Sequence, residues 1–508
     1  MKTMKTGKSP GYDNLAAAFL KKAACQLSET FTGSINTSIQ MGRFPESLKK
    51  GETTPIYKGK ETHNKENYRP VSCLSSMSKI WESQIVTQIN EYFKDVFSKK
   101  LSAFRKSFSC EHVLINATEE WKSALDNNKC VGTVLMDLSK AFDCLPHKLL
   151  IAKLYAYGFS LNACSLIASY LSNRLQRVKH YGVKSEWYTM KKGVPQGSIL
   201  GPVIFNIFIN DLLLDMYDCM FNYADDNTLS IVGDDAQEVK GKLANQSSLC
   251  LNWFSVNMLK ANPSKFQFMI LDRNSSQDQS YEINIGNVCL KSVNCVKLLG
   301  VNIDCNLNYV NHVNHICKKA SRNLKVASRV SHFIPRVEER LAIVNAFVTS
   351  MFSYCPLVWH FSNTTSIRKI EKMYERALRL ISKDYKSDYD VLLSKLQCNT
   401  MLLSRLKCLA VFMFKCKRNL VPEYVNIFQE TNDRYSFRNN QRFELIRYKT
   451  KQYGYRSLRY AGVKLWNSLP LRFKQVKNVE EFKGGLSKWK CTDVICELCM
   501  AHVYHDLK

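Results

Sequence analysis

The stretch FNYADDNTLS, residues 221–230, decides the fold of this chain. Apolar residues lie on both sides of two adjacent aspartates, Asp225 and Asp226. The pattern predicts two short strands joined by a turn, with both carboxylates at the tip of a hairpin. Adjacent carboxylates repel each other, and their burial is costly unless a cation or a donor compensates. A surface turn with two solvated acids is the alternative for this pair taken alone.

A third aspartate follows an upstream apolar run. VGTVLMDL, residues 131–138, predicts a central strand with Asp137 near its end. If this strand lies beside the hairpin, Asp137 and Asp225 form a site for divalent cations. Carboxylate oxygens suit Mg²⁺, which also keeps water and phosphate oxygens as ligands. Two such ions can clamp the attacking and leaving oxygens of a phosphoryl transfer.

The composition favours a polyanionic partner. The 508 residues include 72 Lys or Arg against 44 Asp or Glu, which gives a net charge of +28. Such an excess favours nucleic acid first and an anionic membrane second, and a basic protein without such a partner is the alternative. The 19 cysteines follow no regular spacing and the chain opens without a secretory signal, so we expect reduced thiols in the cytosol or nucleus.

Two further segments shape the expected fold. GVPQGSILGP, residues 193–202, predicts a loop that leads into an apolar helix beginning at Val203. Residues 341–361 are apolar enough to raise the question of a membrane span. Polar residues interrupt that window, so a buried helix that stops near Pro356 is favoured instead.

Several motifs, in order along the chain, resemble blocks of the reverse transcriptases of LINE-type (non-LTR) retrotransposons, and the chain is identified as a member of that family. The palm-like motifs are DLSKAFD (137–143), GVPQGSILGP (193–202) and YADD (223–226). The others are the fingers-like NYRPVSCLSSMSKIWE (67–82) and LSAFRKSFSCEHVL (101–114), the primer-grip-like KLLGVNID (297–304), and the tail-like YRSLRYAGVKLWNSLP (455–470). The chain resembles animal mobile-element open reading frames without their N-terminal endonuclease.

The resemblance implies an α+β, right-hand polymerase fold with fingers, palm and thumb. An antiparallel palm sheet is expected, followed by a helical and basic C-terminal region. The implied regions are an N-terminal helical extension of the fingers (1–50), fingers and palm (51–305), a helical thumb-like region (306–425) and a basic aromatic C-terminal region (426–508).

The implied activity is RNA-directed DNA polymerisation, with a DNA 3′-hydroxyl extended on an RNA template. The implied partners are the RNA template, a DNA primer or nicked target DNA, and dNTPs, with no membrane. A ribonucleoprotein in nucleus and cytoplasm is expected. Two alternatives remain: an inactive relic that only binds nucleic acid, and an RNA-copying RNA polymerase.

The family resemblance assigns the metal site. It implies that Asp137 and Asp225 bind two Mg²⁺ ions, or Mn²⁺ in their place, with Asp226 beside them. The backbone carbonyl of Leu138 is a further implied ligand. Asp143 has the same side chain, but we interpret it as an acid at a helix start rather than a metal ligand.

The nucleotide site is assigned in the same way. An aromatic residue at the position of Phe142 lies under the incoming sugar in this family and blocks a 2′-hydroxyl, whereas core packing is the alternative. Gln196 and Gly197 match the loop that touches the nascent base pair and the nucleotide.

Four basic residues match less specific positions. Arg69 is the candidate for gripping the triphosphate, because a guanidinium fork suits phosphate oxygens. Lys58 is a second candidate, or a solvated loop lysine. Lys265 resembles the lysine proposed to protonate pyrophosphate, with a structural role as the alternative. Arg105 resembles a fingers arginine without an assigned role.

A basic stripe follows on a predicted helix at 365–384. Its cations recur at three-four spacing, opposite an apolar face. They are Arg368, Lys372, Arg376, Arg379 and Lys383. They form either a solvated helix face or a surface for the template-primer backbone.

The C-terminal part is basic and aromatic. Residues 431–490 hold 15 Lys or Arg against 4 Asp or Glu. This predicts an RNA-binding surface. The alternative is a structural cap docked through Leu465, Trp466 and Leu469.

A cysteine-histidine cluster lies near the end of the chain. Cys496 and Cys499, with Cys491, His502 and His505 nearby, have zinc-like spacing. Free thiols are favoured over zinc, because the cluster holds a single tight cysteine pair.

Overall fold

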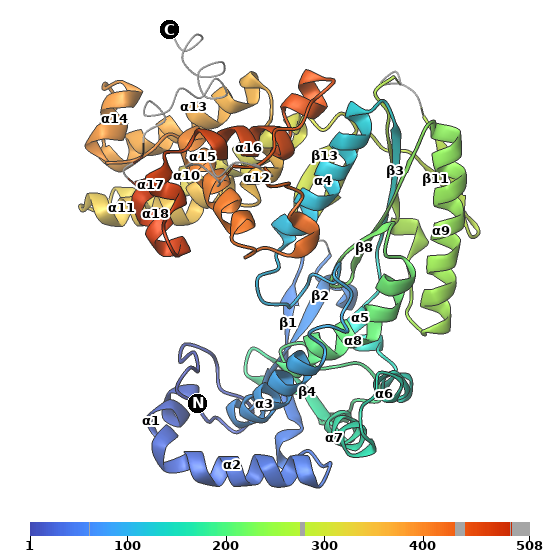
Figure 1. Cartoon of the computed structure of the whole chain (residues 1–508). Helices are drawn as coiled ribbons and strands as arrows, with labels where there is room; N and C mark the ends of the chain where they lie inside the picture. The colour runs from blue at the N-terminus through green and yellow to red at the C-terminus, as the bar shows by residue number, and fades with distance from the viewer. Residues whose placement is uncertain (60, 275–279, 432–441, 488, 490–508) are drawn as a thin grey trace. The chain divides into compact units, whose positions relative to one another are not determined.

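The computed structural model describes residues 1–508 except 60, 275–279, 432–441, 488 and 490–508 (Figure 1). The chain divides into two compact units, each built from three segments. Unit 1 comprises residues 1–104, 136–227 and 246–266. Unit 2 comprises residues 105–135, 228–245 and those from 267 on.

The regular elements confirm a mixed α+β chain. The helices are α1 Ala17–Lys22, α2 Ala24–Gln40, α3 Ser76–Tyr92, α4 Cys110–Asp126, α5 Ala141–Cys144, α6 His147–Ala156, α7 Leu161–Leu171, α8 Leu200–Asp215, α9 Ala236–Val256, α10 Val310–Ser331, α11 Val337–Phe347, α12 Pro356–Trp359, α13 Thr364–Ser382, α14 Tyr389–Lys395, α15 Met401–Lys417, α16 Leu458–Ser468, α17 Leu471–Lys474 and α18 Val479–Ser487. The strands are β1 Lys50–Tyr57, β2 Tyr68–Leu74, β3 Cys130–Met136, β4 Leu175–His180, β5 Val183–Lys184, β6 Tyr188–Thr189, β7 Met220–Tyr223, β8 Asp226–Gly233, β9 Gln267–Leu271, β10 Glu282–Ile285, β11 Val288–Lys291, β12 Cys295–Leu298 and β13 Val301–Asp304.

A five-stranded sheet in unit 1 carries the start of the fingers-like motif 67–82, on β2. Its strand order is β2-β1-β4-β5, with β6 paired to β4. Strand β1 runs antiparallel to β2, with Ile56 opposite Arg69, and parallel to β4, with Glu52 opposite Arg177. Arg69, the candidate for gripping the triphosphate, therefore lies on β2 at the edge of this sheet.

The second sheet contains the predicted central strand. Its order is β7-β8-β3-β9, and β3 is almost wholly buried. Strand β9 runs antiparallel to β3, from Val131 opposite Leu271 to Leu135 opposite Gln267. A Cβ at Gly132 would lie 2.4 Å from Val239 of α9, so the glycine allows this helix to approach β3 closely. The expected antiparallel sheet is confirmed.

Helix α8 begins earlier than the sequence predicts. It starts at Leu200 rather than Val203. The hydroxyl of Ser198 accepts the N–H of Gly201, and the Glu82 carboxylate accepts the N–H groups of Ile199 and Leu200. Proline is tolerated in a first helical turn, so Pro202 does not delay the start.

The apolar window at 341–361 is not one helix. Helix α11 ends at Phe347, a 3₁₀ turn covers Thr349–Phe352, and Pro356 opens α12. The prediction of a helix stopped near Pro356 was wrong, because proline fits the first position of a helix and here starts one. Among the described residues, no helix is long and apolar enough to span a bilayer.

Unit 2 contains the later helices, which Figure 1 shows grouped together from α10 to α18 in yellow to red. Leu465 and Trp466 of α16 are 0% exposed, and Trp466 lies near the rings of Phe414 and Phe482. These contacts favour the cap interpretation for this part of the chain. The cluster that includes Cys496 and Cys499 lies outside the described residues.

Candidate active site

A cleft of about 870 Å³ in unit 1 brings together most of the predicted site residues. Its lining includes Lys58, Arg69, Asp137, Leu138, Phe142, Gln196, Gly197, Asp225 and Lys265. These residues come from positions far apart in the sequence. Asp226 is not among the lining residues.

The hairpin turn places Asp225 at the cleft. Strand β7 ends at Tyr223, Ala224 has φ +56°, and β8 begins at Asp226. The Asn222 amide donates to the Ala224 carbonyl and to the Asn227 side chain, both at 2.9 Å. The Asn227 amide donates to the Asp225 carbonyl at 3.2 Å.

These two asparagines therefore fix the turn that carries the carboxylates. Both are 1% exposed. Sequence reasoning missed them, although an asparagine close to each side of the Asp-Asp pair was a visible signal. A buried amide with several partners stiffens the segment around it.

The carboxylates are electrostatically crowded. Burial, followed by the charge of Asp137, raises the pKa of Asp225, while Arg69 and Lys58 partly oppose the shift. Desolvation, then the charges of Asp225 and Asp137, raise the pKa of Asp226 to about 6. Each shift means that the negative charge is under-compensated by the protein alone. A bound cation would remove that deficit.

The donor set fits Mg²⁺. Asp137 and Asp225 offer hard carboxylate oxygens, and Leu138 lines the same cleft. In the described part of the chain, no three His, Cys, Asp or Glu side chains form a ready metal cluster. Mg²⁺ commonly takes its remaining ligands from water and substrate phosphate.

The backbone after β3 is fixed against the segment that carries Lys265. Ser139 N–H donates to the Lys260 carbonyl at 2.8 Å, and Asn262 N–H donates to the Asp137 carbonyl at 3.1 Å. The Lys265 ammonium lies 3.4 Å from an Asp137 oxygen, and both side chains are partly exposed. Lys265 thus lies beside Asp137, a predicted metal ligand.

Phe142 both packs and faces the cleft. Its ring stacks on Phe205, with centroids 4.4 Å apart, and meets Phe104 edge-on at 6.1 Å. Phe205 is fully buried in α8 and gives the ring a rigid support. The side chain of Phe142 is half-buried, so the two interpretations, core packing and sugar contact, are compatible.

Gly197 of the 193–202 loop lies against the fingers sheet. Gly197 has φ +127°, and a Cβ there would lie 2.3 Å from the Ser72 carbonyl oxygen. Ser72 N–H donates to the Gln196 carbonyl at 2.7 Å. Gly197 therefore allows the backbone of this loop to approach strand β2 closely.

Asp143 has a role that sequence reasoning missed. It lies in the first turn of α5, as predicted, and accepts a hydrogen bond of 2.9 Å from the Gln196 side-chain amide. Burial raises the pKa of its carboxyl group. Asp143 thereby orients Gln196 at the cleft.

Glu82 is a second missed residue. Its carboxylate is 0% exposed and accepts the N–H groups of Ile199 at 2.7 Å and Leu200 at 3.3 Å. The Ser78 hydroxyl donates to it at 2.8 Å. This carboxylate fixes the point where the 193–202 loop becomes α8. The motif resemblance gave no sign of this contact.

The remaining basic residues differ in setting. Arg69 and Lys58 are exposed at the cleft. Arg105 belongs to unit 2, where its guanidinium lies 4.4 Å from the centre of the Phe108 ring. On α13, Lys372 and Arg376 are exposed, whereas Arg379 pairs with Glu375 at 2.7 Å.

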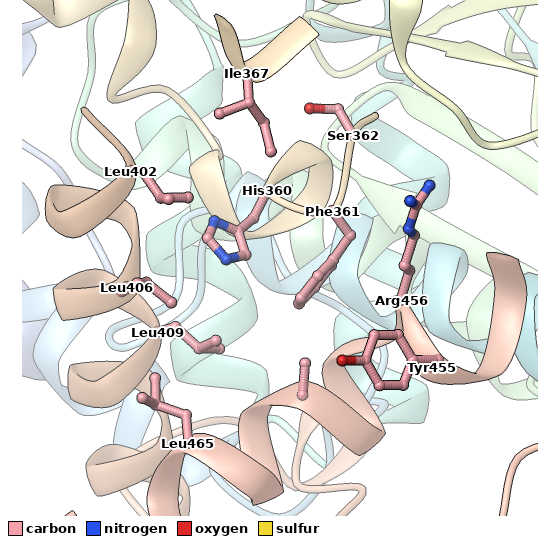
Figure 2. Close-up of a pocket in the computed structure, with 11 residues that line it drawn as sticks. His360, Phe361, Ser362, Ile367, Leu402, Leu406, Leu409, Tyr455, Arg456 and Leu465 are labelled. Atoms are coloured by element: carbon pink, nitrogen blue, oxygen red, sulfur yellow. The ribbon is translucent and has the colours of Figure 1, made fainter. Parts of the chain in front are cut away.

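A different cavity lies in unit 2. Figure 2 shows Leu402, Leu406 and Leu409 of α15 facing it, with Phe361 on another side. Its volume is about 40 Å³ and its lining is mostly apolar. Ligand pockets commonly measure about 300–1,000 Å³, so this cavity is too small for a nucleotide. The cleft of unit 1, which gathers the predicted catalytic and nucleotide-binding residues, is the candidate active site.

The chain is similar to known proteins over the residues that line this cleft. Residues 52–303 match the family described as reverse transcriptase (RNA-dependent DNA polymerase). The chain is 26% identical to a probable RNA-directed DNA polymerase from transposon BS of Drosophila melanogaster, over 75% of this chain and 44% of that protein. It is 25% identical to the corresponding probable enzyme of the X-element from the same organism, over 74% and 42%.

A solved structure is also similar, at a lower level. Apo telomerase from Candida Tropicalis has 11% sequence identity and a TM-score of 0.37, with 79% of this chain and 74% of that chain covered. The chain spans less than half the length of the two transposon proteins named above.

Proposed function

Residues 52–303 form a reverse transcriptase domain of the non-LTR transposon type, and from this premise we propose that the protein is an RNA-directed DNA polymerase. It extends the 3′-hydroxyl of a DNA primer, or of nicked target DNA, on an RNA template. The observation that carries the proposal is the convergence of Asp137 and Asp225 in one cleft with Phe142, Gln196 and Arg69.

The cleft residues divide the reaction among them. Asp137, Asp225 and the Leu138 carbonyl would hold two Mg²⁺ ions, with Asp226 adjacent. When bound, Mg²⁺ neutralises charge on the triphosphate and promotes ionisation of the primer hydroxyl. Arg69 donates to phosphate oxygens in the bidentate manner of a guanidinium.

Other side chains select the incoming nucleotide and assist the release of pyrophosphate. The ring of Phe142, fixed on Phe205, leaves no polar partner for a 2′-hydroxyl and excludes ribonucleotides. Gln196, oriented by Asp143, contacts the nascent base pair beside Gly197. Lys58 adds positive charge near the triphosphate. Lys265 supplies a proton donor for the departing pyrophosphate.

Regions outside the cleft complete the proposal. Residues 1–50 extend the fingers, 51–305 form fingers and palm, 306–425 act as a thumb, and 426–508 form the C-terminal region. Arg368, Lys372, Arg376 and Arg379 of α13 follow the template-primer backbone, and Arg379 does so from its ion pair with Glu375. The protein acts in nucleus and cytoplasm as a ribonucleoprotein.

Primer extension on an RNA template with Mg²⁺ tests the proposal. Asp137→Asn and Asp225→Asn should each lower dNTP incorporation at least about a hundredfold, since a lost metal ligand costs several kcal/mol in the transition state. RNA binding should stay within a few-fold of the parent. Asp234→Asn, an exposed aspartate outside the cleft, is the matched control. Activity within a few-fold of the parent would overturn the two-metal assignment, whereas an inactive parent that still binds RNA would favour the relic.

Phe142→Ala separates a DNA polymerase from an RNA polymerase. Removal of the ring should raise the ratio of rNTP to dNTP incorporation while dNTP use persists. A parent enzyme that already prefers rNTPs, or a ratio unchanged by the substitution, would contradict the role of Phe142.

A further inference from the structure

A small hairpin on the five-stranded sheet of unit 1 takes no part in the cleft. Strands β4 and β5 pair with Lys179 opposite Lys184 and His180 opposite Val183. Tyr181 and Gly182 form the two-residue turn between them, with φ of +46° and +85°. Two positive φ angles in such a turn are typical of type I′, which favours Asn-Gly. We call residues 177–184 the Tyr181 hairpin.

Tyr181 is an unusual occupant of this turn. Its side chain is 95% exposed and contacts His180 edge-on, with ring centroids 4.5 Å apart. A bulky residue at positive φ costs about 1 kcal/mol or more relative to asparagine or glycine. Folding does not repay that cost by burial of the ring. A ring held in this position is therefore explained better by a contact that the folded chain makes with a partner.

One face of the Tyr181 hairpin is strongly cationic. Glu52, on the neighbouring strand β1, accepts from Arg177 at 3.0 Å and pairs with Lys184 at 3.0 Å and Lys179 at 3.6 Å. One carboxylate thus faces three cations. Like charges directly opposite each other in a sheet, as Lys179 and Lys184 are, destabilise it.

The lysines remain available to an external anion. Their side chains are 45% and 40% exposed, whereas that of Glu52 is 7% exposed. The buried acid therefore gathers the cations without covering them. A phosphate backbone would relieve the excess positive charge.

We propose that the Tyr181 hairpin binds an unpaired RNA strand, with one base stacked on Tyr181 and the phosphates beside Lys179 and Lys184. An exposed ring next to cations is the combination that binds single strands, because the bases of a duplex already stack on one another. The identification of this strand as the RNA template rests on the proposed function. The contact itself needs no catalysis.

The first test is equilibrium binding of a short unstructured RNA without dNTPs. Tyr181→Asn should weaken binding about tenfold, the scale of one base-aromatic stack. The same change creates the favoured Asn-Gly turn, so the melting temperature should stay equal or rise, which rules out misfolding as the cause. Tyr181→Trp should keep the affinity. Tyr155→Ala, another exposed tyrosine of unit 1, is the matched control.

Each outcome of that test decides the stacking claim. An affinity of Tyr181→Asn within twofold of the Tyr155→Ala control overturns it. Equal weakening for duplex and single-stranded RNA overturns it too, since a duplex has no free base to stack. Asp225→Asn should bind RNA normally, so loss of polymerase activity and loss of this contact are distinguishable.

The second test addresses the cations. Lys179→Gln and Lys184→Gln should each flatten the plot of log affinity against log salt by about 0.7, the value for one phosphate contact on a single strand. An unchanged slope in both variants would mean that the phosphates lie elsewhere, and would overturn the backbone part of the proposal.

Discussion

Carboxylates have different partners at the hairpin turn of unit 1 and in the helical part of unit 2. At the hairpin turn, Asp225 faces the cleft with Asp226 next to it, and the burial of both groups and the charge of Asp137 raise their pKa values. In unit 2, Glu119 accepts the N–H groups of Leu458 and Arg459, at 2.9 and 3.0 Å. Glu371 accepts those that open α15 in the same way.

The difference shows that the same type of side chain, a carboxylate, serves catalysis at one place and stability at another. A carboxylate at a helix start satisfies backbone N–H groups that have no partner within the helix, and it lies at the positive end of the helix dipole. The charges of Asp225 and Asp226 are under-compensated by the protein, as their raised pKa values show, and so favour a bound cation. Replacing a carboxylate at the hairpin turn should therefore stabilise the metal-free protein. Replacing a carboxylate that caps a helix should destabilise it.

The largest effect is expected from truncation after residue 430. This removes α16 with its buried Trp466, and leaves Glu119 and Asp126 without the N–H groups that they bind. Thermal unfolding followed by circular dichroism should show loss of the cooperative transition of unit 2. A chain that ends after residue 489 keeps α16 and serves as control. An unchanged transition in the shorter chain would mean that the C-terminal region is not a structural cap.

Glu119→Ala comes next. Glu119 also pairs with Lys122 at 3.3 Å, and both side chains are 3% exposed. Removal of one partner from a buried pair costs about 3 kcal/mol or more, because the other charge remains buried. Chemical denaturation should show this loss. Glu119→Gln, which keeps one acceptor oxygen, should lose less, and equal losses would contradict the capping role.

Glu82→Ala should affect both stability and activity, since Glu82 caps α8 beside the cleft. Two N–H groups lose their acceptor, which should cost about 2 kcal/mol of unfolding free energy. The 193–202 loop also loses an anchor, so kcat for primer extension should fall. Steady-state kinetics with Glu82→Gln as the conservative variant checks this. Full activity in Glu82→Ala would show that the loop needs no such anchor.

The smallest expected effect is a gain in stability rather than a loss, caused by Asp226→Asn. The folded pKa of Asp226, about 6, lies above the ordinary value of 3.8, so the folded protein binds this proton more tightly than the unfolded chain does. Its contribution to stability is complete below about pH 4 and is lost as the pH rises through 6. Asp226→Asn should therefore stabilise the metal-free protein by about 1 kcal/mol at pH 7, after allowance for solvent screening.

Melting temperatures at pH 5 and pH 7, with and without Mg²⁺, measure this effect. The advantage of Asp226→Asn should grow between the two pH values and shrink when Mg²⁺ is added. A destabilised variant at pH 7 would place Asp226 with the capping carboxylates rather than with those of the cleft.

The sequence predicted the parts of the site that lie within short motifs. The carboxylates of the YADD hairpin and the strand before Asp137 could be found in this way, because their chemistry and their local structure coincide. Glu82 could not be found, since it lies 117 residues from the N–H group of Ile199 that it binds. The start of α8 was placed too late, and a helix was predicted to stop near Pro356 where α12 begins, because prolines were taken as helix breakers although both lie in first turns.

The cap on α16 has a consequence for synthesis of the protein. Glu119 and Leu458 are 339 residues apart, so helix α4 leaves the ribosome long before its partner exists. At about 5–20 residues per second, that interval lasts roughly 20 seconds to a minute. Throughout it Glu119 lacks the N–H groups of α16, although α4 can already contact earlier partners such as Ser230, which accepts from Trp121. The capping of Glu119 is therefore a late step in the synthesis of unit 2.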